Sequence, residues 1–184
     1  MLTEKDRSPP PPIIIRALDY IAEITGTTTA WLTAVMVIIA CIVVGLRHLF
    51  DIGSIALQES VTYMHAAVFM LGTAFTLKRG GHVRVDIFYR RIQPRTRAWV
   101  DALGSLLFTL PLMVFIGVGS VEFVCESWRI SEDSQDSGGV GGVYLLKTLL
   151  PVMAISVSLQ AIAELLRNLL VLMNITPTVE HASC

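Results

Sequence analysis

The sequence predicts an all-α integral membrane protein with four transmembrane helices. The 184-residue chain is 53% hydrophobic and has a mean hydropathy of +0.64, which is high for a soluble protein. Four stretches carry almost no charge, and each is close to the roughly 20 helical residues needed to cross a hydrocarbon core of about 30 Å. Core helices of a soluble protein would need polar faces, which these stretches lack.

The uncharged stretches define the spans. From Ile24 to Leu46 there are 23 residues without Asp, Glu, Lys or Arg. This run exceeds the roughly 7–15 apolar residues of a signal peptide, so we expect it to remain as a membrane anchor. The fourth stretch has the least distinct end, because Glu164 and Arg167 interrupt it. The spans are predicted at about residues 24–46, 54–77, 100–121 and 148–170.

The links between the spans predict the orientation. The link from Lys78 to Arg97 holds seven Lys or Arg residues and one acid, Asp86, whereas the link from Glu122 to Lys147 holds five acids and two bases. Cytoplasmic links collect Lys and Arg, so the basic link is predicted to be cytoplasmic. Four spans then place both termini in the cytoplasm. The tails are predicted at residues 1–12, which are proline-rich and extended, and 175–184.

A short amphipathic helix is predicted on the cytoplasmic membrane surface before the first span. Ile14, Leu18 and Ile21 recur at helical spacing and form its apolar face. The opposite face carries Arg16, Asp19 and Glu23.

A second surface helix is predicted inside the basic link. Gly80 and Gly81 suit the left-handed cap that ends the second span, and Pro94 suits the first turn of the third. Between them, four apolar residues group on one helical face. These residues are Val85, Phe88, Tyr89 and Ile92.

Glu59 is a candidate functional residue, because ionisable groups inside a membrane are costly. It lies near the start of the second span, where the helix dipole favours an anion. This position favours a structural carboxylate over a proton carrier, which stays the alternative.

Other charged and polar candidates lie near the cytoplasmic membrane edge. Ser156, Gln160, Glu164 and Arg167 share one face of the fourth span, which we expect to pack against protein. Glu164 and Arg167 are spaced to pair with each other. Lys78 and Arg79 end the second span, where cations suit the helix dipole and anionic headgroups.

The sequence shows no pattern of catalysis. It contains no phosphate-binding loop, no nucleophile with an adjacent base and no cluster of metal ligands, so we expect no catalytic residue, metal, cofactor or nucleic-acid partner. Cys41, Cys125 and Cys184 lie far apart in the sequence, which argues against a membrane thiol oxidoreductase.

The stretch from Glu59 to Pro94, with its motif GTAFTLKRGGHVRVDIFYRRIQP, resembles the small membrane subunit (DctQ type) of tripartite ATP-independent periplasmic (TRAP) transporters. The resemblance covers roughly residues 13–173. It makes the motif residues candidates for contacts with the cytoplasmic ends of helices, with a large subunit or with phospholipid headgroups. These residues are Lys78, Arg79, His82, Arg84 and Asp86.

The resemblance implies a division of labour in the bacterial inner membrane. A periplasmic substrate-binding protein (DctP type) captures a small organic anion, and a large subunit (DctM type) carries the sodium and substrate sites. The small, multi-pass subunit acts as a scaffold beside the large one. The alternative hypothesis is a stand-alone, proton-coupled transporter with four spans that uses Glu59.

Overall fold

The structure is a computed structural model that describes residues 12–80 and 93–173. All its regular elements are helices, and no strand occurs in these two ranges, which confirms the all-α prediction. Four helices are long and apolar enough to cross a membrane. The elements are α1 (Ile13–Phe50), α2 (Ile55–Lys78), α4 (Pro94–Gly104), a π-helical segment η2 (Ser105–Thr109), α5 (Leu110–Arg129) and α6 (Val143–Leu172).

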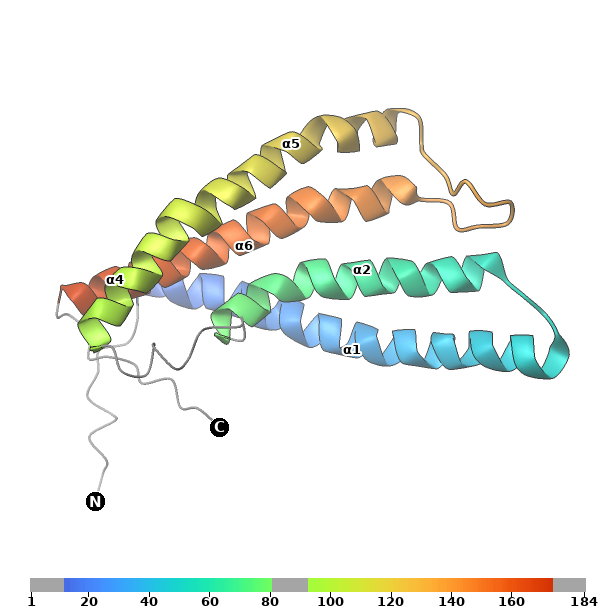
Figure 1. The fold of residues 1–184 in the computed structure, drawn as a ribbon, viewed down its shortest axis with the longest axis horizontal. Helices are drawn as coiled ribbons and strands as arrows, with labels where there is room; N and C mark the ends of the chain where they lie inside the picture. Colours follow the sequence, from blue (N-terminus) through green and yellow to red (C-terminus); the bar gives the residue numbers. More distant parts are fainter. Residues whose placement is uncertain (1–11, 81–92, 174–184) are drawn as a thin grey trace, which may run out of the picture.

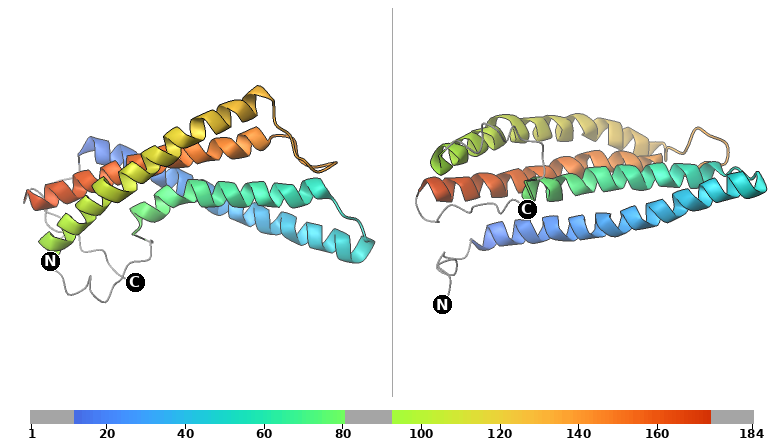
Figure 2. Two further views of the ribbon diagram at one scale, coloured as in Figure 1. Left: turned by 45° about the horizontal axis from the view of Figure 1, so that its top comes forward. Right: turned by 60° about the horizontal axis from the view of Figure 1, so that its bottom comes forward.

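The helices lie side by side in the order α5, α6, α2, α1 (Figures 1 and 2). Helix α6 is the central element and packs against α1, α2, α4 and α5. It has a larger share of buried residues than the other spans, whereas α1 and α5 expose many large aliphatic side chains. In a membrane these exposed side chains face lipid or a partner protein.

The helix predicted before the first span exists, but it is continuous with that span. Helix α1 runs for 38 residues, about 57 Å, without a break at the predicted boundary near Ile24. A separate surface helix is therefore a wrong prediction. The side chain of Asp19 bonds to α6 and that of Glu23 bonds to α2. These bonds keep the start of α1 packed against the other helices.

Small residues let the helices approach closely. Phe75 of α2 packs so tightly over Gly26 of α1 that a Cβ on Gly26 would lie 2.3 Å from the Phe75 ring. Close packing through small residues is the usual way in which membrane helices associate. The buried apolar residues of the described helices are mostly alanines: Ala22, Ala74, Ala98, Ala102, Ala154, Ala161 and Ala163.

Helices α4 and α5 form one continuous helix that is widened at η2. The N–H of Leu110 bonds to the carbonyl of Ser105, five residues earlier, which is the π pattern. Pro111 follows directly. A proline has no N–H to donate, and its ring crowds the carbonyl four residues earlier, that of Leu107, so a regular α-helix is disfavoured here.

Two predicted helix ends are confirmed. Gly80 follows α2 with a φ of +63°, the left-handed conformation that glycine adopts without strain, and its N–H bonds to the Leu77 carbonyl at 3.0 Å. Pro94 is the first residue of α4. Gly81, the predicted surface helix at 83–92 and nearly all of both predicted tails lie outside the described residues.

Candidate contact sites at the two ends of the bundle

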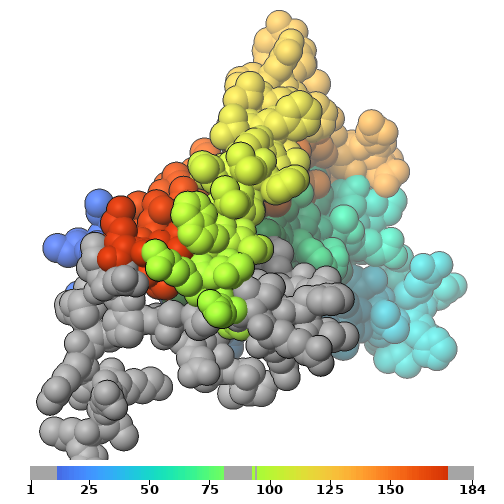
Figure 3. Space-filling model, turned by 60° about the vertical axis from the view of Figure 1, so that its left-hand side comes forward, coloured from blue at the N-terminus to red at the C-terminus, as the bar shows by residue number. Residues whose placement is uncertain are grey.

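Charged side chains of three helices meet at the end of the bundle where α1 starts and α2 and α6 end. Figure 3 looks onto this end, where the starts of α1 and α4 and the end of α6 come together. We call this group the Asp19 cluster. Its members are Asp19, Glu23, Lys78, Arg79, Gln160 and Arg167.

Asp19 connects α1 to α6. Arg167 donates from Nη2 to both carboxylate oxygens of Asp19, at 3.0 Å and 2.8 Å. Gln160 approaches the same carboxylate from Nε2 at 3.5 Å, and its side chain is buried. Arg167 therefore pairs with Asp19 of another helix and not, as expected, with Glu164, which is half-buried one turn earlier.

Glu23 connects α1 to α2. It accepts hydrogen bonds from Lys78 at 2.6 Å and from Arg79 at 2.7 Å. Lys78 also donates to the backbone carbonyl of Asp19 at 2.9 Å. The side chain of Lys78 is only 19% exposed, whereas that of Arg79 is 60% exposed, so only Arg79 keeps a large surface for headgroups. Both predicted cations thus hold α2 against α1.

The acidic partners in this cluster were not among the candidate residues. Asp19 and Glu23 were assigned to the polar face of a surface helix and expected to face water. Their spacing of four residues places them on one side of α1, facing the ends of α2 and α6. The sequence does contain a pattern that indicates these ion pairs: two acids of α1 lie at the same membrane edge as the cations of α2 and α6.

Glu59 bonds to the link between α5 and α6, at the opposite end of the bundle. Ser134 donates its hydroxyl to Oε1 of Glu59, and the Val140 N–H donates to Oε2 at 2.6 Å. The chain passes so close to Glu59 that a Cβ on Gly139 would lie 2.6 Å from Oε2 and 2.3 Å from the Ser134 hydroxyl. We call this arrangement the Glu59 clamp, and its partners were not foreseen.

A second set of contacts holds the start of the same link. Lys147 and Ser127 both donate to Oε2 of Glu132, the latter at 2.7 Å. These bonds, with that from Lys147 the stronger influence, hold the pKa of Glu132 below its ordinary value. Lys147 also lies over the Phe123 ring, 3.9 Å from its centroid. The Trp128 indole donates to the Thr148 hydroxyl at 2.9 Å, which joins α5 to α6.

These contacts are structural in kind. The part of the chain that the structure describes contains no group of three or more His, Cys, Asp or Glu side chains that could hold a metal ion. The motif residues His82, Arg84 and Asp86 lie outside the described residues, so their proposed contacts stay predictions.

Comparison with known proteins agrees with the fold. The family described as "Tripartite ATP-independent periplasmic transporters, DctQ component" matches residues 36–171. No curated protein and no solved structure matched the chain. The family match covers more than half of the chain and includes the end of α1, all of α2 and α5, and nearly all of α6. The chain therefore belongs to the DctQ family and is the small membrane component of a TRAP transporter, located in the inner membrane.

Proposed function

We propose that this chain is the scaffold subunit of a sodium-coupled TRAP importer for small organic anions such as carboxylates, keto acids or sulfonates. It packs beside the large DctM-type subunit, which carries the sodium and substrate sites. A DctP-type periplasmic protein delivers the substrate to this pair.

The observation that supports a scaffold role is that charged side chains at both ends of the described bundle bind other parts of the same chain. Asp19 and Glu23 join three helices at one end of the bundle, and Glu59 holds a link at the other. A transport site needs polar groups that face a path near the middle of the membrane. Glu59, the candidate coupling carboxylate, is occupied by two donors at the membrane edge instead.

Reconstitution tests the proposal. The small chain, the large subunit and the pair are placed separately in vesicles and supplied with the binding protein, a panel of organic anions and a sodium gradient. We expect uptake only from the pair, and co-purification of both membrane subunits. Uptake by the small chain alone, driven by a proton gradient and lost in Glu59→Gln, would establish the stand-alone transporter instead.

A further inference from the structure

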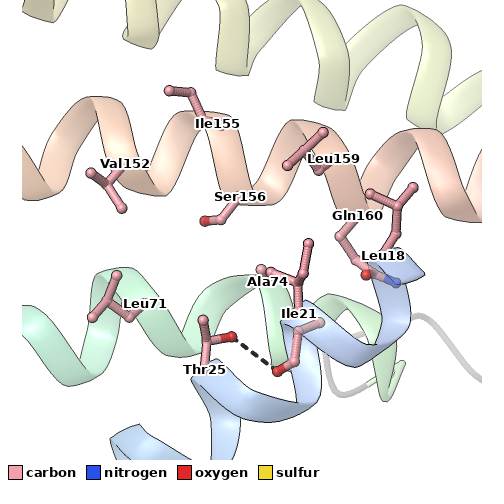
Figure 4. A pocket seen from close by; sticks show the side chains of 11 residues that line it. Leu18, Ile21, Thr25, Leu71, Ala74, Val152, Ile155, Ser156, Leu159 and Gln160 are labelled. Carbon is pink, nitrogen blue, oxygen red and sulfur yellow. Dashed lines mark hydrogen bonds between the residues drawn. The ribbon is translucent and has the colours of Figure 1, made fainter. Parts of the chain in front are cut away.

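A cavity of about 300 Å³ lies between α1, α2 and α6, next to the Asp19 cluster (Figure 4). Leu18, Leu71 and Leu159 supply part of its aliphatic wall, one from each helix. The two hydroxyl groups in the wall bond within their own helices. Thr25 donates to the Ala22 carbonyl at 2.9 Å, and Ser156 donates to the Met153 carbonyl at 3.0 Å. The cavity surface is therefore suited to a hydrocarbon chain.

The cavity opens between exposed aliphatic side chains. Ile21 of α1 and Ile155 of α6 line it and are 48% and 61% exposed. In a bilayer, lipid acyl chains are the solvent around such an opening, so they are always available to enter it. Because lipid tails are as apolar as leucine, a partner helix gains no hydrophobic energy by displacing them.

Arg167 lies beyond the lining residue Gln160, and both side chains bond to Asp19. It shares one face of α6 with Ser156 and Gln160, both of which line the cavity. Its side chain is 27% exposed, and only Nη2 bonds to Asp19. Within the described ranges Nε and Nη1 have no acceptor. A guanidinium with free N–H groups is well suited to a phosphate.

The charge at this end of the bundle favours an anionic ligand. The described side chains here include six bases and four acids, a net charge of +2, which attracts acidic headgroups of the inner leaflet. The bases are Arg16, Lys78, Arg79, Arg95, Arg97 and Arg167, and the acids are Asp19, Glu23, Asp101 and Glu164.

From these observations we infer that the cavity is a binding site for one anionic glycerophospholipid. One acyl chain fills the space between α1, α2 and α6, and the phosphate binds the free N–H groups of Arg167. Asp19 orients the guanidinium by holding Nη2. This lipid site does not depend on the scaffold role.

Native mass spectrometry of the chain co-purified with its large subunit tests the site. The complex is supplied in mild detergent with equal amounts of phosphatidylglycerol or phosphatidylcholine, and the lipids retained are counted. We expect one phosphatidylglycerol per small chain to be retained in preference to phosphatidylcholine. Arg167→Gln should lower its retention roughly five-fold, the effect of losing about 1 kcal/mol from one cationic contact.

Two matched substitutions separate this site from general lipid binding. Thr25→Leu fills the cavity and should remove the retained lipid. Thr28→Leu makes the same change on an exposed face of α1, where the hydroxyl bonds to the Ile24 carbonyl at 2.9 Å, and should not. If Thr25→Leu prevents assembly, Ser156→Leu fills the cavity from the opposite wall.

Three results would overturn the inference: equal retention of both lipids, retention unchanged when the cavity is filled, or an Ile155→Cys variant that cross-links to the large subunit in a complex without bound lipid. The last would show that protein occupies the cavity. Assembly and uptake are scored separately, so a failed scaffold role is distinguished from a failed lipid site.

Discussion

At the scale of single residues, Glu59 holds the link between α5 and α6 by accepting hydrogen bonds from the Ser134 hydroxyl and the Val140 N–H. Its place near the start of a span predicted a structural carboxylate, which agrees with the two hydrogen bonds it accepts. Its partners, Ser134 and Val140, lie 75 and 81 residues away in a link without periodicity. One partner is a backbone N–H, which any residue type other than proline supplies, so no pattern in the sequence identifies it.

We predict that Glu59→Gln leaves most transport intact. Glutamine keeps one acceptor oxygen and the size of the side chain, so one of the two hydrogen bonds persists. The loss should be about 1–3 kcal/mol of local stability in the link between α5 and α6, measured by hydrogen exchange at Val140. Abolished uptake in a normally assembled complex would favour a coupling role.

The same clamp can be opened without changing its charge. Gly139→Ala places a methyl group against Ser134 and Glu59, so it should raise exchange at Val140. Gly53→Ala, in the link between α1 and α2, meets no atom within 4 Å and serves as the control. Equal exchange in the two variants would contradict the clamp.

A third prediction at this scale compares two arginines. Arg167→Gln breaks a half-buried ion pair between helices and should cost about 1–3 kcal/mol, between the values for exposed and buried pairs. Arg129→Gln breaks the exposed pair with Glu126 and should cost less than about 0.5 kcal/mol. The side chain of Arg129 is 75% exposed and that of Glu126 is 53% exposed. Thermal unfolding in detergent measures both, and equal losses would mean that Asp19 does not hold α6.

At the scale of elements, the sequence predicts which stretches are helical better than where each helix begins and ends. Each uncharged stretch falls within one long helix, because hydropathy alone is sufficient to identify a span. The start of α1 is predicted as a separate surface helix because the sequence pattern of Asp19 and Glu23 is the same whether they face water or pair with a cation. Lys78, Arg79, Gln160 and Arg167 are predicted to contact a partner protein or lipid, and that stays a prediction; their bonds within the chain depend on tertiary packing. The π segment depends on the fit of Pro111 against Leu107.

The π segment predicts an unusual tolerance to deletion. A π turn holds one extra residue, so deleting Phe108 should remove the π turn and keep both halves facing α6, with a kink at Pro111. Deleting Phe69, a similarly exposed residue in the regular helix α2, rotates the following residues by about 100°. Assembly yield should survive the first deletion and fall in the second. Loss of assembly in both would mean that the π turn has a further role.

A pH dependence is expected for the link between α5 and α6. The pKa of Glu132 is lowered by its bonds to Lys147 and Ser127, so this contact contributes fully above the ordinary carboxyl value of 4.5. The contribution is lost as pH falls through the lowered pKa. Hydrogen exchange at the Glu132 N–H, which bonds to the Ser127 carbonyl, should rise in acid after correction for its intrinsic rate. Glu132→Gln should remove this dependence, and an unchanged profile would contradict it.

At the scale of the whole molecule, the distribution of charge predicts the orientation. The excess of Lys and Arg from Lys78 to Arg97 places that end in the cytoplasm. After replacement of Cys41, Cys125 and Cys184, Gln135→Cys should react with an impermeant reagent added to the periplasm, whereas Gln93→Cys should not. The reverse labelling pattern would refute the topology.

The length of α1 makes the molecule sensitive to bilayer thickness. Its uncharged portion, residues 24–46, is about 34 Å long, slightly more than a hydrocarbon core of about 30 Å, so we expect the helix to tilt in the membrane. Asp19 and Glu23 bond the start of α1 to α6 and α2. A thinner membrane increases the mismatch between the length of α1 and the hydrocarbon core. The resulting change in tilt is opposed by the bonds of Asp19 and Glu23, so the Asp19 cluster is where bilayer thickness affects the packing of the subunit.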